Sequence, residues 1–137
     1  MPEKVRHTSH ARYSLWYHVV WGTKYRKHVW KEDHTKARVK VVLKAIAFQY
    51  DMEIGELEVM SDHVHLMLCA PPRMAPAHAV QILKSLSTKT LLEEFPWLHK
   101  EYWGGEIWVR GYFVRSVGVG ITKATIDRYI REQSEEI

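Results

Sequence analysis

The order of strand-like and helix-like segments constrains the fold of this chain more than any other feature. Strand-like patterns cover residues 12–23, 52–60, 63–69 and 106–117, the last as a strand or a broken hairpin. Apolar residues at helical spacing predict helices over residues 33–50, 76–95 and 123–133. The order β-α-β-β-α-β-α is close to a ferredoxin-like plait with an added C-terminal helix. We therefore expect an α+β fold in which a mainly antiparallel sheet carries its helices on one face.

Turn and breaker residues set the limits of these segments. Ser61-Asp62 suits a tight turn, so the two strands on either side of it are expected to form a hairpin. Pro96 ends the second helix, and Thr122 is a good N-cap for the last one. A chain of 137 residues with 46% hydrophobic residues fits one domain with a buried core. We expect a single domain over residues 1–137, with a flexible lead over 1–11 and the last helix within 121–137.

The distribution of charge suits a polyanionic partner. Residues 1–44 hold 11 Lys and Arg against 3 Asp and Glu, whereas residues 45–137 hold 9 against 13. A basic first third of this kind fits a nucleic-acid-binding face, although a solvated basic surface gives the same pattern. No apolar run approaches the roughly 20 residues of a membrane span, and the start of the chain is polar rather than signal-like. The expectation is a cytoplasmic protein without a membrane partner, whose single Cys69 is a small buried hydrophobe.

Two histidines of one predicted strand are candidate metal ligands. His63 and His65 are separated by Val64, and residues i and i+2 of a strand point to the same side. Two neutral imidazoles placed in this way can reach one cation. The alternative is that one histidine is buried and hydrogen-bonded while the other is a surface residue. A rigid apolar strand with one polar edge favours a pre-organised site.

The last predicted helix carries a possible nucleophile. Tyr129 and Gln133 are four residues apart and therefore share a helix face, while Ile126 and Ile130 can dock the helix on the core. A tyrosine hydroxyl can attack a phosphodiester, but its ordinary pKa of about 10 means that it needs help at neutral pH. A divalent cation supplies that help, with magnesium or manganese as candidates and Gln133 as a third ligand. The alternative is a half-exposed tyrosine and glutamine without a chemical role.

The segment Asp62-His63-Val64-His65-Leu66 resembles the His-hydrophobe-His strand of the HUH endonucleases. The chain as a whole resembles the TnpA-type, single-tyrosine transposases of the insertion-sequence 200/605 family. The segments that carry this resemblance are residues 17–21, 24–26, 60–65, 83–87, 94–96, 103–108, 111–113, 117–118 and 129–133. The chain departs from the family pattern at Val109-Arg110, where small residues with a proline are frequent, and at Arg115, where a smaller residue is usual.

The resemblance implies a DNA strand transferase. Such enzymes cleave and rejoin single-stranded DNA through a covalent 5′-phosphotyrosine with a divalent metal, and recognise hairpins at the ends of insertion sequences. It implies Tyr129 as the nucleophile and His63, His65 and Gln133 as metal ligands. It also implies a homodimer joined near residues 106–117, whose composite active sites take the histidines from one subunit and the tyrosine helix from the other. Gly118 and Gly120 would provide the flexible link for that crossover.

The remaining candidate residues concern DNA contacts. The side chains predicted to meet phosphates or bases are Arg12, Lys24, Tyr25, Arg26, Lys27, Lys84 and Lys89. For each of them a solvated surface side chain is the alternative. Trp103 and Trp108 are expected in the core or a dimer interface, and His18 is interpreted as a packed strand histidine.

Three rival functions remain open at this point. A replication initiator or relaxase shares the histidine strand, but those chains are usually longer and place the tyrosine differently. A nucleic-acid-binding module without chemistry predicts that Tyr129→Phe is harmless. A domesticated relative would still cleave DNA without mobilising an element.

Overall fold

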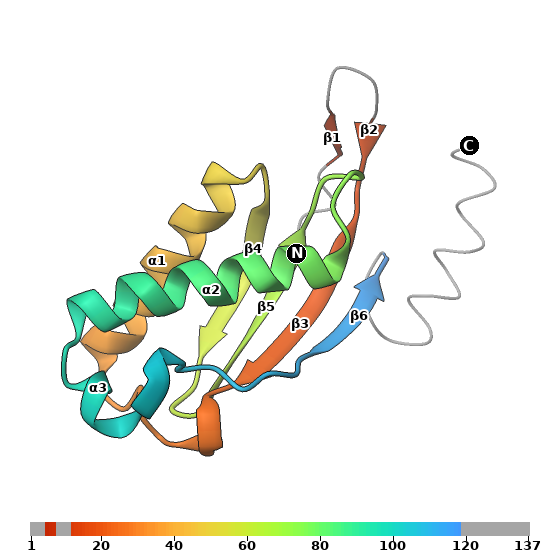
Figure 1. Ribbon diagram of the computed structural model, residues 1–137. Coiled ribbons are helices and arrows are strands. Elements are labelled where there is room, and N and C mark those ends of the chain that lie inside the picture. The colour runs from red at the N-terminus through yellow and green to blue at the C-terminus, as the bar shows by residue number, and fades with distance from the viewer. Residues whose placement is uncertain (1–4, 8–11, 119–137) are drawn as a thin grey trace.

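The computed structural model describes residues 5–7 and 12–118 (Figure 1). Its strands are β1 (Arg6–His7), β2 (Arg12–Tyr13), β3 (Trp16–Gly22), β4 (Glu53–Val59), β5 (His63–Cys69) and β6 (Phe113–Val117). Its helices are α1 (Asp33–Gln49), α2 (Pro76–Glu94) and α3 (Leu98–Glu101), with 3-10 turns η1 (Lys24–Arg26) and η2 (Trp103–Gly105). Tyr129, Gln133, Gly120 and the expected helix within 121–137 lie outside the described residues.

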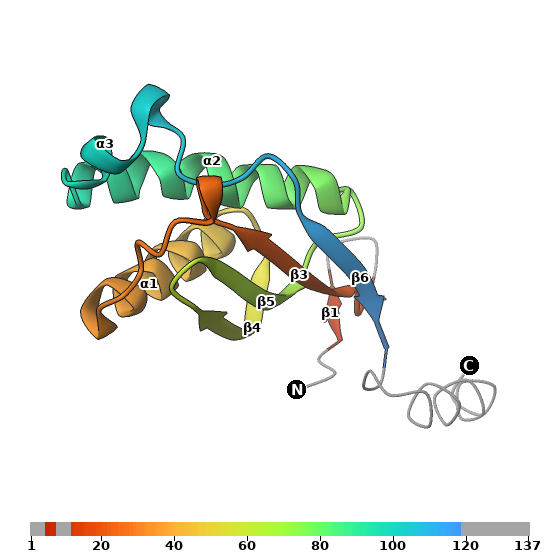
Figure 2. The ribbon, with the colours of Figure 1, turned by 90° about the horizontal axis from the view of Figure 1, so that it is seen from below.

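The main sheet has four strands in the order β4-β5-β3-β6, and each neighbouring pair is antiparallel. Figure 2 shows the two long helices, α1 and α2, on the same side of this sheet. Both pack on the core cluster that includes Val19 and Trp21 of β3 and Val64, Leu66 and Leu68 of β5. The structure therefore confirms the predicted α+β plait, with a mainly antiparallel sheet and its helices on one face. The opposite side of the sheet is called the open face below.

Alternation in β5 separates core residues from candidate site residues. Val64, Leu66 and Leu68 are essentially fully buried under the helices, whereas His63 and His65 are only half-buried and lie on the open face. The hairpin of β4 and β5 turns at Ser61-Asp62 as predicted, and the Met60 N–H donates to the His63 carbonyl at 2.8 Å. Burial of the apolar set fixes which side of the strand faces outward.

The structure differs from the predicted segments in three places. Of residues 106–117 only Phe113–Val117 forms a strand, because Trp108 enters the core and its indole N–H donates to Ser87 Oγ at 2.9 Å. The predicted strand over residues 12–23 is divided into β2 and β3, and part of the expected flexible lead, Arg6–His7, is β1 paired with β2. The short helix α3 follows Pro96 and was not predicted. Within residues 5–7 and 12–118, no helix combines the length and apolar character needed to cross a membrane.

Candidate functional site

His63 and His65 lie side by side on the open face, as the sequence predicts. Their ring centroids are 6.1 Å apart and their planes differ by 28°. The side chain of His63 is 31% exposed, so its ring is held by the protein but still reachable. Two imidazoles in this arrangement fit the first two ligands of a divalent cation.

Asp62 orients the ring of His63. Its Oδ1 lies 2.8 Å from His63 Nδ1, and its Oδ2 accepts from Arg26 Nε at 3.2 Å and Nη2 at 2.9 Å. The hydrogen bond from His63, supported by Arg26, lowers the pKa of Asp62 and keeps it an ionised acceptor. A proton held on Nδ1 would leave the lone pair of His63 Nε2 free to bind a cation. The sequence predicts a turn at Asp62 and a DNA contact at Arg26, but it does not indicate that the two side chains pair.

Gly22 makes room for the contact between Arg26 and Asp62. It pairs with His63 in the sheet register, and a Cβ on Gly22 would lie 2.8 Å from Arg26 Cδ. Contacts this short do not occur, so the Arg26 side chain would have to move. A residue without a side chain at position 22 therefore lets the guanidinium reach the carboxylate beside His63.

Replacing Asp62 by alanine is expected to weaken manganese binding by about 10- to 100-fold, because outer partners of ligand histidines have effects of this size. Titration calorimetry with Mn²⁺ measures the change. Asp51→Ala is a matched control, since Asp51 is an exposed carboxylate paired with Arg73 at 2.8 Å. Equal Mn²⁺ affinity in Asp62→Ala and Asp51→Ala would contradict the orienting role.

His18 of β3 packs against the candidate pair. Its ring centroid is 6.0 Å from that of His65 and 6.1 Å from that of Phe113, both with edge-on geometry. Burial lowers the pKa of His18, and the nearby His65 and Arg115 lower it further. A neutral ring in apolar contact agrees with its interpretation as a packed strand histidine.

The described residues supply two candidate ligands and not a complete set. Among them, no three His, Cys, Asp or Glu side chains are grouped closely enough to hold a metal ion. A cation at the histidine pair would therefore need a donor from elsewhere. Gln133, the third ligand expected from sequence, lies outside the described residues and stays a prediction.

The basic cluster at residues 24–27 is largely occupied by partners within the protein. Lys24 Nζ lies 3.7 Å from Glu106 Oε1, and Lys27 Nζ donates to the Glu101 carbonyl at 2.9 Å. Arg26 is bound to Asp62, as described above. Tyr25 is 72% exposed and is the member of the cluster most open to solvent. Arg12 on β2 and Lys89 on α2 are exposed, and their DNA contacts stay predictions.

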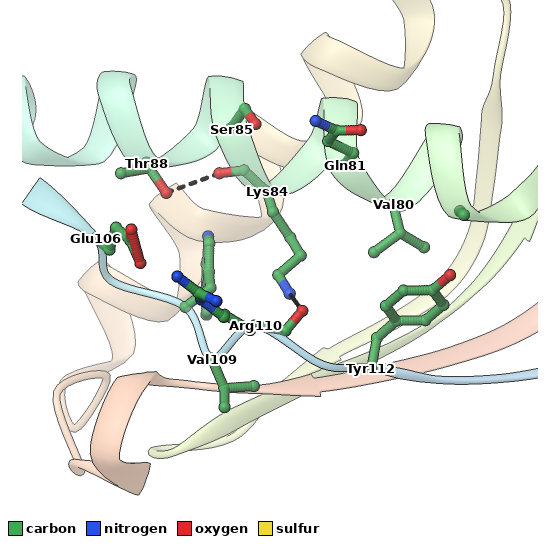
Figure 3. Close-up of a pocket in the computed structure, with 11 residues that line it drawn as sticks. Val80, Gln81, Lys84, Ser85, Thr88, Glu106, Val109, Arg110 and Tyr112 are labelled. Carbon is green, nitrogen blue, oxygen red and sulfur yellow. Dashed lines mark hydrogen bonds between the residues drawn. The ribbon is translucent and has the colours of Figure 1, made fainter.

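Lys84 has a structural role that the sequence did not indicate. Figure 3 shows its side chain reaching from α2 to the segment before β6, where Nζ donates to the carbonyls of Arg110 at 3.0 Å and Gly111 at 3.1 Å. It lies in a cavity of about 580 Å³ that Gln81 and Tyr112 also line. Burial lowers the pKa of Lys84. The Lys84 ammonium group therefore has hydrogen-bond partners within the protein, and its position does not require a phosphate.

Lys84→Met is expected to lower the free energy of unfolding by about 1–2 kcal/mol, because it removes two hydrogen bonds to carbonyls that then bond only to water. Urea denaturation measures the change. Lys89→Met on the exposed side of α2 is the control, with an expected effect within about 0.5 kcal/mol. A phosphate-binding role would give the reverse result, with unchanged stability and weaker DNA binding in Lys84→Met.

Three further expectations have different outcomes. Trp108 is buried, with its ring centroid 5.8 Å from those of both Trp21 and Trp30, as expected for a core residue. Trp103 is 90% exposed, so it does not lie in the core, and its other expected place, a dimer interface, stays a prediction. Gly118 directly follows β6, where a hinge was expected, but the segment that it would move lies outside the described residues.

Comparison with known families matches residues 11–133 to the family described as "Transposase IS200 like". The chain is 36% identical over 124 residues to the ISDra2 transposase TnpA of Deinococcus radiodurans, covering 90% of this chain and 87% of that protein.

Solved structures agree with the family match. A crystal structure of a candidate transposase from Deinococcus radiodurans R1 superposes with a TM-score of 0.74 at 38% identity, covering 93% of this chain and 97% of the other. A REP-associated tyrosine transposase bound to a REP hairpin has a TM-score of 0.56 at 12% identity, covering 94% of this chain and 74% of that one. At that identity the second likeness concerns the fold alone.

Proposed function

Because this chain belongs to the IS200-like transposases, we propose that it cleaves and rejoins single-stranded DNA through a covalent link between Tyr129 and a 5′-phosphate. The observation that carries the proposal is the His63–His65 pair on the open face, with Asp62 directing the His63 ring. This arrangement presents two imidazole rings beside a solvent-reachable surface. Such a surface can admit a DNA backbone next to a bound cation.

The proposed chemistry needs one nucleophile and conserves the phosphodiester energy. The phenolic oxygen of Tyr129 attacks phosphorus and loses its proton, while the bond to the 3′ oxygen breaks and releases a 3′-hydroxyl. Attack by a 3′-hydroxyl on the phosphotyrosine then rejoins a strand and frees the tyrosine. No nucleotide cofactor is required, because the energy of the broken bond is kept in the covalent link.

His63 and His65 would hold magnesium or manganese, with Gln133 as the third ligand. When bound, this cation withdraws charge from a non-bridging phosphate oxygen and orients the phosphate. Asp62 keeps the His63 ring in its ligand tautomer, and Arg26 keeps Asp62 in place. These contacts would therefore hold the candidate ligand atoms in place for a cation and its phosphate.

We further propose that the substrate carries hairpins and that the enzyme is a homodimer. A hairpin substrate is supported by the REP-associated transposase, which is a structural neighbour bound to a REP hairpin. β6 lies at the edge of the four-stranded sheet, so a second copy could pair with it near residues 106–117. Gly118 and Gly120 would then let the Tyr129 helix cross to the histidine pair of the partner.

The proposal is tested by incubating the full chain with end-labelled, hairpin-containing single-stranded DNA and Mg²⁺ or Mn²⁺. A DNA–protein adduct that survives denaturation and disappears with chelator is the expected result. Duplex DNA of the same sequence is the control substrate, on which no adduct is expected. Binding of the single strand without any adduct would instead favour a non-catalytic binding module.

A further inference from the structure

Two side chains of β6 share the open face with the candidate metal ligands. Phe113 and Arg115 are two residues apart on this strand, so both point to the same side of the sheet. Val20 of β3 is the register partner of Phe113 on one side and of His65 on the other. Side chains of register partners share a face, so Phe113 lies on the face of His65 and two strand spacings away, roughly 10 Å.

Ring contacts connect the histidine pair to these two residues. The ring centroid of His18 lies 6.0 Å from that of His65 and 6.1 Å from that of Phe113. The guanidinium carbon of Arg115 lies 5.9 Å from the centroid of the Phe113 ring. The open face is therefore continuous from the candidate ligands on β5, across β3, to the edge strand β6.

Both β6 side chains are open to a ligand. Phe113 is 51% exposed, and Arg115 is exposed as well. In the described part of the chain no carboxylate forms an ion pair with Arg115, unlike Arg26 and Arg73, which each have one. A guanidinium is well suited to bind a phosphate, and an aromatic ring beside it can stack on a base.

The two sides of the histidine pair differ in charge. On the β4 side, Glu56 and Glu58 line a cavity of about 320 Å³ together with His65, and Glu58 is the register partner of His65. On the β6 side, the open face carries the cationic Arg115. A DNA backbone is repelled by carboxylates and attracted by a guanidinium. A strand with one phosphate at the histidines is therefore directed across β3 towards β6.

We propose that Arg115 binds a backbone phosphate, and Phe113 stacks on an adjoining base, of the single strand that runs from the His63–His65 pair across β3. This inference rests on the proposed function, since it takes single-stranded DNA as the substrate. Neither contact reads a particular base, so the surface holds the strand without selecting its sequence. A second copy that pairs with the free edge of β6 would use backbone groups and leave both side chains on the open face.

The salt dependence of binding tests the role of Arg115. Binding of fluorescein-labelled oligo-dT to the full chain is measured at several salt concentrations, with chelator present to prevent cleavage. Each phosphate contact to a single strand adds about 0.7 to the slope of log affinity against log salt, so Arg115→Ala should reduce the slope by about 0.7 and weaken binding about 5-fold at about 0.1 M salt. Arg115→Lys is expected to keep the slope, because the charge remains.

Arg73→Ala is the matched control for the loss of one guanidinium. Arg73 is exposed outside the four-stranded sheet and is paired with Asp51 at 2.8 Å, so its loss should leave the slope unchanged. Equal slopes for wild type, Arg115→Ala and Arg73→Ala would overturn the phosphate contact. An equal decrease in both variants would reflect net charge alone and would overturn it as well.

Phe113→Leu tests the stacking contact separately. Leucine keeps apolar bulk beside His18 but has no flat ring, so oligo-dT binding is expected to weaken by at least about 5-fold, the lower end of the range for one stacked base, at an unchanged salt slope. Phe48→Leu is its control, since Phe48 is 84% exposed on α1 and lies outside the sheet. Equal affinities of these two variants for oligo-dT would overturn the stacking contact.

The proposed function and this inference fail in distinguishable ways. A wild-type protein that binds oligo-dT but forms no adduct with hairpin-containing DNA would contradict the proposed function, while the smaller slope of Arg115→Ala would still support the surface. A wild-type protein that forms the adduct but binds no oligo-dT would contradict this inference alone, because neither proposed contact depends on a hairpin or on the base sequence.

Discussion

Tyr129→Phe is expected to form no covalent DNA adduct and to lower strand cleavage by on the order of 10³-fold or more, because removing a nucleophile removes the step that depends on it. The substitution deletes one oxygen and keeps the ring, so binding of single-stranded DNA should persist. Denaturing electrophoresis of end-labelled DNA measures both the adduct and the free cleaved strand. The expected picture is intact binding with no bond cleavage.

Tyr50→Phe is the matched control for the loss of one phenolic oxygen. Tyr50 is 40% exposed at the end of α1 and takes no part in the proposed chemistry, so this variant should cleave like the wild type. An adduct that persists in Tyr129→Phe would show that another side chain is the nucleophile. Peptide mapping of that adduct would then identify the residue.

His65→Ala is expected to reduce metal-dependent cleavage by more than about 100-fold at limiting Mn²⁺, since a direct ligand should matter more than its outer partner. His65 is half-buried on the open face, and the core side of β5 is untouched by the change. The folded state should therefore survive, which thermal denaturation checks. Raising the Mn²⁺ concentration should restore part of the activity, because weakened binding is opposed by mass action.

His99→Ala serves as the comparison for the loss of one imidazole, since His99 is exposed on α3. It should leave Mn²⁺ affinity and cleavage unchanged. If His65→Ala bound Mn²⁺ as tightly as His99→Ala does, the histidine pair would not be the metal centre. The proposed function would then require a different set of ligands.

The sheet and the histidine pair could be predicted because both depend on local alternation. In β5 the apolar residues Val64, Leu66 and Leu68 occupy one face, which places His63 and His65 on the other. The same short-range pattern, together with the Ser61-Asp62 turn, located the β4–β5 hairpin. Features that depend on residues close together in the sequence could therefore be predicted from it.

The features that escaped prediction depend on contacts between distant residues. Arg26 reaches Asp62 across 36 positions, and only the sheet register brings Gly22 opposite His63 to permit it. Lys84 is drawn to the carbonyls of Arg110 and Gly111 because Trp108 holds that segment against α2 through Ser87. No periodicity or turn motif reports such pairings, because the partners meet only after the elements have packed.

The location of the histidine pair on β5 affects which mutations the fold of this protein can tolerate during evolution. β5 is an interior strand, paired with β3 on one side and β4 on the other, and its alternation sets both the packed face and the ligand face. Loss of a single codon within it would reverse the facing of every residue on one side of the deletion, so that strand residues of the core and of the open face would exchange places there and the fold would be lost with the chemistry. A point substitution at His65 removes only the chemistry. Inactive copies that still fold should therefore arise by substitution, whereas copies with length changes in this strand should be lost altogether.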